Sequence, residues 1–192
     1  MLKKSLSSDS VYVADDFFTD GVDLIERYTC YFDQYDGIKS RRLKSFIDLR
    51  MALESLLKSA HALHGDQGRN RKVVIREVES FRHDILSLAN AVRPYIPGEL
   101  RSELWPFAER MKELPVGLRY ALDGYDFIYA REELYYQTIG NDHWMDSFHK
   151  AICNLKDEID KELSKHSGVV SLSDIPIEKI LNPGFNKYSK KK

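Results

Sequence analysis

A run of apolar residues between positions 46 and 63 recurs at the spacing of one helix face, which limits the possible folds more than any other feature. These residues advance by three or four positions at a time, so their side chains lie along one side of an α-helix. Gly65 follows, and glycine suits the position just after a helix end. The pattern predicts a helix over residues 40–64. The apolar positions are Phe46, Leu49, Leu53, Leu56, Ala60 and Leu63, with a polar stripe beside them at Arg50, Glu54, Lys58 and His61.

The same periodicity recurs along most of the chain, and it predicts an all-α protein. The helix expected over 71–93 ends before Pro94, and in an alternative interpretation it begins only at Ser80. A partly helical segment over 118–139 is expected to break near Gly124. Short joins between long amphipathic helices favour an antiparallel bundle of four to five long helices. The further helices are expected at 16–35, 98–113 and 141–165, with a short C-terminal helical turn within 173–181.

Length and composition limit the domain organisation and the classes of partner. The chain of 192 residues fits one helical domain over 11–168, with a disordered leader at 1–10 and an extension with a basic tail at 169–192. A net charge of −1 gives no global sign of a nucleic-acid or membrane partner. The two cysteines have neither metal-site spacing nor a disulfide framework. With no long apolar run, these features favour a cytoplasmic protein.

Three short stretches occur in an order that resembles the HEPN superfamily of helical domains. They are "LRMALESLLKSAHALHG" at 49–65, "RHDILSLANAV" at 82–92 and "LRYALDGY" at 118–125, followed by a final amphipathic helix. The resemblance covers roughly residues 41–165. It implies a dimer-forming helical domain linked to RNA or nucleotides, often in toxin–antitoxin or defence systems with a partner antitoxin or defence protein. Active members of the family are metal-independent ribonucleases, so the resemblance implies no cofactor.

The family's catalytic motif is an arginine followed by a histidine after four to six intervening residues. Arg76 and His83 have that spacing, although Glu77 stands where the family usually has a small polar residue. On one continuous helix, seven positions rotate by about 700°, so Arg76, His83 and Asn90 would share a face. His83 is then the candidate general base for a ribose 2′-hydroxyl, and Arg76 the candidate phosphate ligand. Asn90 is a supporting residue.

Further basic and acidic residues are candidates for substrate binding. Arg69, Arg71 and Lys72 form a basic cluster that suits phosphate groups, and Arg119 belongs to the "LRY" segment. Asp84 follows the candidate base. If the helix begins near Ser80, Asp84 instead favours the positive end of the helix dipole.

Four other interpretations remain open. The face of Arg76, His83 and Asn90 can be an ordinary solvated surface, and the domain can be a non-catalytic, dimerising interaction module. A metal-dependent phosphohydrolase of the HD type would need a ligand set of histidines and aspartates. Those ligands would be His61 or His64, the His83–Asp84 pair, and Asp123, Asp126 or Asp142. Asp142, Asp146 and His149 also share one face of the last helix, as a solvated face or a weaker metal candidate.

Overall fold

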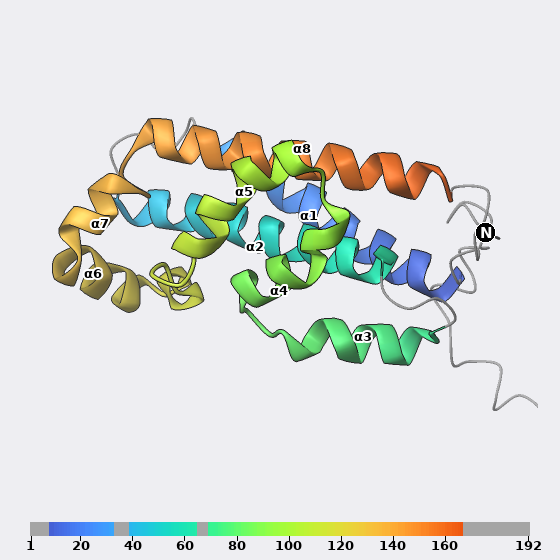
Figure 1. The fold of residues 1–192 in the computed structure, drawn as a ribbon. Helices are drawn as coiled ribbons and strands as arrows, with labels where there is room; N and C mark the ends of the chain where they lie inside the picture. Colours follow the sequence, from blue (N-terminus) through green and yellow to red (C-terminus); the bar gives the residue numbers. More distant parts are fainter. Residues whose placement is uncertain (1–7, 33–38, 65–68, 167–192) are drawn as a thin grey trace, which may run out of the picture.

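The computed structural model describes residues 8–32, 39–64 and 69–166. Over these ranges the chain forms eight α-helices and two 3-10 helices with no strand, so the all-α class is confirmed (Figure 1). Three helices exceed twenty residues: α1 (Ser8–Phe32), α2 (Lys39–His64) and α8 (Asp142–Ser164). Helix α1 begins before residue 10, so the predicted leader overlaps its first turn. The predicted turn within 173–181 lies outside the described residues.

Helix α2 is the centre of the fold. It packs against α1, α8, α3, α4 and α6, and Figure 1 shows it running through the middle of the molecule. All six apolar residues of its predicted stripe are buried, and Leu49, Leu53 and Leu56 have no exposed surface. The prediction of this helix and of its buried face is therefore confirmed.

Helices α1 and α2 pack closely at Gly21. A Cβ atom placed there would lie 2.9 Å from two side-chain atoms of Leu56, which is fully buried. We expect Gly21→Val to lower the free energy of unfolding by about 1–3 kcal/mol, because the added carbons would overpack the contact. Urea denaturation measures the change. Gly98→Ala is the control, since its Cβ would meet only the tip of Arg101, and equal losses in both variants would contradict the assignment.

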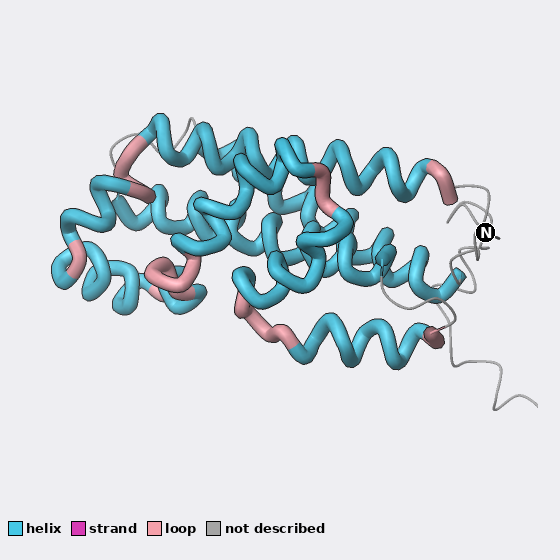
Figure 2. The backbone as a smooth tube through the Cα atoms, in the orientation of Figure 1, coloured by secondary structure: helices cyan, strands magenta, loops and turns pink. Residues whose placement is uncertain are grey.

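The segment 71–93 is not one continuous helix, and neither sequence interpretation of it is correct. Helix α3 (Arg71–Ser80) ends in a turn at 81–84, and α4 (Ile85–Val92) begins after it, as Figure 2 shows. Asp84 is the N-cap of α4, where its side chain accepts a hydrogen bond from the Ser87 amide at 3.0 Å. Arg82 has a positive φ of 51° and directs the chain into the turn. The apolar periodicity survives because each short helix buries its own face against the core.

The second half of the chain is divided into shorter helices. A 3-10 helix, η1 (Arg93–Tyr95), leads through Pro97 into α5 (Gly98–Arg110). After η2 (Val116–Arg119), helices α6 (Ala121–Ala130) and α7 (Glu132–Gln137) meet at Arg131. The break predicted near Gly124 is therefore wrong. Gly124 lies inside α6, where a Cβ would approach Leu43 to 2.8 Å, so this glycine permits close packing.

Helix α8 covers the core along its buried face. Phe148, Ile152, Leu155 and Ile159 are buried there, as the periodicity predicts. Phe148 packs among Phe46, Phe107 and Trp144. Among the described residues, no helix combines the length and apolar character that a bilayer crossing requires.

Candidate functional site

The candidate base His83 lies in the turn between α3 and α4, not on a helix. Its position is fixed from both sides, because its backbone oxygen accepts a hydrogen bond from Arg50 Nη2 at 3.1 Å and the next residue caps α4. The preceding residue, Arg82, is the one non-glycine residue with positive φ in the described ranges. Backbone strain of this kind occurs often at functional sites. The turn therefore presents the imidazole from a fixed backbone position.

The imidazole of His83 contacts a buried carboxylate on α2. Its Nδ1 lies 3.2 Å and 3.1 Å from the two carboxylate oxygens of Glu54. The Glu54 side chain is 3% exposed, whereas that of His83 is 49% exposed. With Glu54 ionised, Nδ1 is the donor, which leaves Nε2 of the neutral ring as the acceptor. Within the described ranges, no hydrogen bond involves Nε2, so this atom is available to a ligand.

Two cations on α2 share the same carboxylate. Lys58 Nζ donates to Glu54 Oε1 at 2.7 Å, and Arg50 Nη1 lies 3.8 Å from Oε2. Both are one helical turn from Glu54, so the three side chains form a row on one helix face. Together the positive charges of Arg50 and Lys58 offset part of the cost of burying the Glu54 carboxylate.

Arg50 connects α2 to two distant segments. Its Nε donates to the Leu114 backbone oxygen at 3.2 Å, in addition to the bond to the His83 oxygen. Burial lowers the pKa of Arg50 from its ordinary value, and the Glu54 carboxylate opposes that shift. Its buried Nη1 has no hydrogen-bond partner, only the longer ion pair with Glu54. Removal of Glu54 would therefore leave a buried charge without its counter-ion.

The three predicted catalytic residues are not aligned on one helix, which corrects the geometry expected from their spacing. Arg76 is exposed on α3, His83 lies in the turn, and Asn90 is on α4. Across the described residues, no hydrogen bond or ion pair joins Arg76 to either of the others. Asn90 instead accepts a hydrogen bond from Trp105 Nε1 at 3.3 Å. A catalytic role for these residues remains a prediction.

The predicted substrate-binding residues differ in how accessible they are. Asp84 is occupied as a helix cap, and hydrogen bonds from the Ser87 amide and hydroxyl lower its pKa. Arg69 pairs with Glu77 and its side chain is only 11% exposed. Arg71 pairs with Asp16 at 3.0 Å. Lys72 is exposed, and the exposed Arg119 lies over the Tyr120 ring with its guanidinium carbon 4.7 Å from the centroid.

The ligand set of the metal-dependent alternative is not brought together. His61 packs edge-on against Phe81, and His64 stacks on the Tyr95 ring at 4.6 Å between centroids. In the part of the chain that the structure describes, no group of three histidine, cysteine or acidic residues is placed to hold a metal ion. In the other proposed set, Asp142 pairs with Arg42 and His149 packs against the Tyr28 ring. The geometry therefore gives the HD-type interpretation no support.

We expect the protein to lose stability at mildly acidic pH, because three of its histidines are partly buried. Burial lowers the pKa of His61, His64 and His149 below the ordinary value of 6.5. As the pH falls, these three histidines are therefore protonated at a higher pH in the unfolded chain than in the folded chain. We expect the free energy of unfolding to fall as the pH is lowered from about 7.5 to about 5.5. Urea denaturation at each pH checks this, and replacing all three with glutamine should flatten the decline.

Sequence reasoning missed Glu54 and Arg50 as members of the site. The sequence shows the polar stripe within residues 40–64, but its spacing does not indicate that the charged side chains of Arg50 and Glu54 are buried next to His83. A pair of opposite charges one turn apart, beside a strictly apolar stripe, was the available signal. Comparisons with protein-family models, curated proteins and solved structures found no match.

Proposed function

We propose that the protein is a HEPN-like, metal-independent endoribonuclease in which His83 is the general base and Glu54 its positioning residue. One observation carries the proposal: a half-exposed imidazole contacts a buried carboxylate through Nδ1, with Nε2 left unpaired toward a ligand. This arrangement fixes the ring orientation and stabilises the imidazolium that forms on proton uptake. The order of the "ALESLLK", "HDILSL" and "LRY" segments supports RNA as the substrate.

The proposed reaction requires no group beyond the protein, the RNA and water. Nε2 of His83 accepts the proton of a ribose 2′-hydroxyl, and that oxygen attacks the adjacent phosphorus. The bond from phosphorus to the 5′-oxygen breaks with its electron pair, and the 5′-oxygen takes a proton from solvent or from a second imidazolium. The products are a 2′,3′-cyclic phosphate and a 5′-hydroxyl. A homodimer would supply the second histidine, as the resemblance implies.

The charges around His83 suit an anionic substrate. Four cationic residues belong to this part of the fold, beside the carboxylates of Glu54 and Asp84. The cations are Arg50 and Lys58 at Glu54, Arg82 beside His83, and Lys112, whose charge acts on Asp84. Arg82 in the turn and Lys112 after the end of α5 are exposed, so we propose them as phosphate ligands, with Arg76 on α3 as a third.

An RNA-cleavage assay tests the proposal. Purified protein is incubated with a structured RNA in the presence and absence of a chelator, beside His83→Ala and Arg76→Ala proteins. We expect chelator-resistant cleavage that leaves a 2′,3′-cyclic phosphate and is lost in His83→Ala. If Arg76→Ala lowers the cleavage rate less than His83→Ala does, Arg76 is assigned to phosphate binding. Absence of cleavage by the folded wild-type protein, or cleavage that survives His83→Ala, would reject the proposal.

A non-catalytic, dimerising module is the second candidate function, and exposed tyrosines favour it. Tyr125, Tyr129 and Tyr136 on α6 and α7 are 49%, 83% and 50% exposed. Tyrosine is enriched at protein interfaces because its ring contributes apolar area while its hydroxyl remains solvated. We propose that a second copy of this chain binds the surface formed by these tyrosines. For either function we propose a cytoplasmic setting in a toxin–antitoxin or defence system.

The dimer is tested by sedimentation equilibrium of the wild type and of a Tyr125→Ser, Tyr129→Ser double variant. We expect the dissociation constant of the dimer to rise at least tenfold in the variant, since two aromatic side chains are removed from the interface. Lys72→Ser is a control on an exposed residue of another helix. A monomeric wild type, or a dimer unaffected by the double variant, would contradict this surface assignment.

A further inference from the structure

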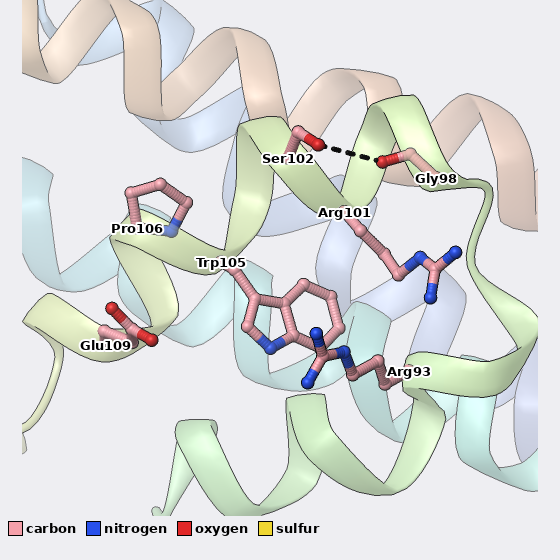
Figure 3. A pocket seen from close by; sticks show the side chains of 7 residues that line it. All are labelled: Arg93, Gly98, Arg101, Ser102, Trp105, Pro106 and Glu109. Atoms are coloured by element: carbon pink, nitrogen blue, oxygen red, sulfur yellow. Dashed lines mark hydrogen bonds between the residues drawn. The ribbon is translucent and has the colours of Figure 1, made fainter.

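A hollow between η1 and α5 contains charged and aromatic groups that the proposed acid–base site does not use. It has a volume of about 510 Å³ and lies where Arg93 faces the first turns of α5 (Figure 3). Pro94 and Pro97 force the chain to turn here, so the end of α4 and the start of α5 face each other. Arg101 and Trp105 line the hollow from successive turns of α5.

The two arginines of the hollow have no carboxylate partners. Six other arginines of the described segments pair with Asp or Glu side chains, whereas neither the Arg93 nor the Arg101 side chain forms an ion pair or a hydrogen bond with a described residue. Arg93 lies over the Trp105 ring, with its guanidinium carbon 5.7 Å from the centroid. Figure 3 shows Arg101 projecting from α5 beside this pair. Two uncompensated guanidinium groups at one hollow favour an anion with several oxygens.

Trp105 adds an aromatic surface that is held in place. Its Nε1 donates a hydrogen bond to Asn90 Oδ1 at 3.3 Å, so the ring is fixed between α4 and α5. The ring is partly exposed and lines the hollow. A fixed tryptophan beside arginines is the combination that stacks a nucleobase and binds its phosphate. Glu109, at the far end of the hollow in Figure 3, is an acceptor for ribose hydroxyls.

We propose that this hollow is a nucleotide-binding site, in which Arg93 and Arg101 bind the phosphate and Trp105 stacks on the base. Its volume lies within the range of about 300–1,000 Å³ that is usual for small-ligand pockets. None of the residues that form the acid–base site, His83, Glu54 and Arg50, lines the hollow, so the two sites are separate. Binding here is measured without turnover, so its outcome does not depend on whether the protein cleaves RNA.

Trp105 itself provides the readout. The chain has two tryptophans, so Trp144→Phe leaves Trp105 as the only one. This full-length variant is titrated with adenosine 5′-monophosphate, with adenosine and with inorganic phosphate, and tryptophan fluorescence is followed. We expect saturable quenching by the monophosphate, with affinity at least tenfold greater than for adenosine or phosphate alone. Arg93→Ala and Arg101→Ala should each weaken binding about tenfold, the loss of a charge-assisted hydrogen bond.

Arg131→Ala, at the junction of α6 and α7, is the matched control and should bind with unchanged affinity. Calorimetric titration of the otherwise wild-type protein and its Trp105→Leu variant gives a second readout, and binding should weaken about tenfold with the stacking surface removed. Three outcomes would overturn the proposal. They are the absence of saturable binding, an affinity of the Arg93→Ala and Arg101→Ala variants equal to that of the protein with both arginines, and phosphate binding as tight as that of the nucleotide.

Discussion

Glu54→Ala is expected to lower the free energy of unfolding by about 3–5 kcal/mol, the usual cost of removing one partner of a buried ion pair. The carboxylate contacts Arg50, Lys58 and His83, and its side chain is 3% exposed. Without it, the Arg50 guanidinium, itself 4% exposed, would keep its charge with only backbone oxygens as partners. Guanidinium chloride denaturation of both proteins measures the difference.

Two further variants separate the charge effect from simple loss of volume. Glu54→Gln keeps the shape and an acceptor oxygen, so it should lose less stability than Glu54→Ala. Replacing both charges, with Arg50→Met and Glu54→Leu, should also lose less than Glu54→Ala alone, because no isolated charge is left buried. A loss below about 1 kcal/mol for Glu54→Ala, the level of an exposed ion pair, would contradict the burial of this network.

His83→Asn is expected to reduce the rate of RNA cleavage by about 10²–10⁴-fold, the usual contribution of a positioned acid–base group. Asparagine can still donate to Glu54 and retains the backbone oxygen that Arg50 binds, so the fold should be preserved. It lacks a nitrogen that can exchange protons near neutral pH. The rate is measured with excess enzyme in a single turnover, and circular dichroism confirms folding.

The matched control for that measurement is His143→Asn, which changes an exposed histidine at the start of α8. Its rate should equal that of the wild type. Equal loss in both variants would indicate a general effect of histidine replacement, and a His83→Asn rate within about threefold of the wild type would remove His83 from the catalytic role.

Much of the fold could be predicted because apolar periodicity directly reports which helix face is buried. Over α2 and the buried part of α8, every strongly periodic position contributes to the core. The break at 81–84 could not be predicted in this way. Its causes are a positive φ at Arg82 and a cap at Asp84, which leave the spacing of buried residues on both sides unchanged.

The site was harder to predict, because it depends on contacts between distant segments. Glu54 and His83 are 29 positions apart, and the bond from Arg50 to Leu114 spans 64 positions. No local pattern encodes such a pairing, and burial of a charge is decided by what packs over it. The family motif predicts His83 from its spacing to Arg76, whereas the contact between His83 and Glu54 depends on the turn at 81–84, which that spacing does not indicate.

Nitrogen-15 NMR of the histidine side chains tests most directly whether Glu54 fixes His83 for catalysis. The chain has six histidines, and the His83→Asn protein identifies the His83 signals. In the neutral form we expect the proton of His83 on Nδ1 and none on Nε2, and we expect this preference to weaken in Glu54→Gln. Neutral His83 with its proton on Nε2, or a tautomer unchanged by Glu54→Gln, would contradict the account.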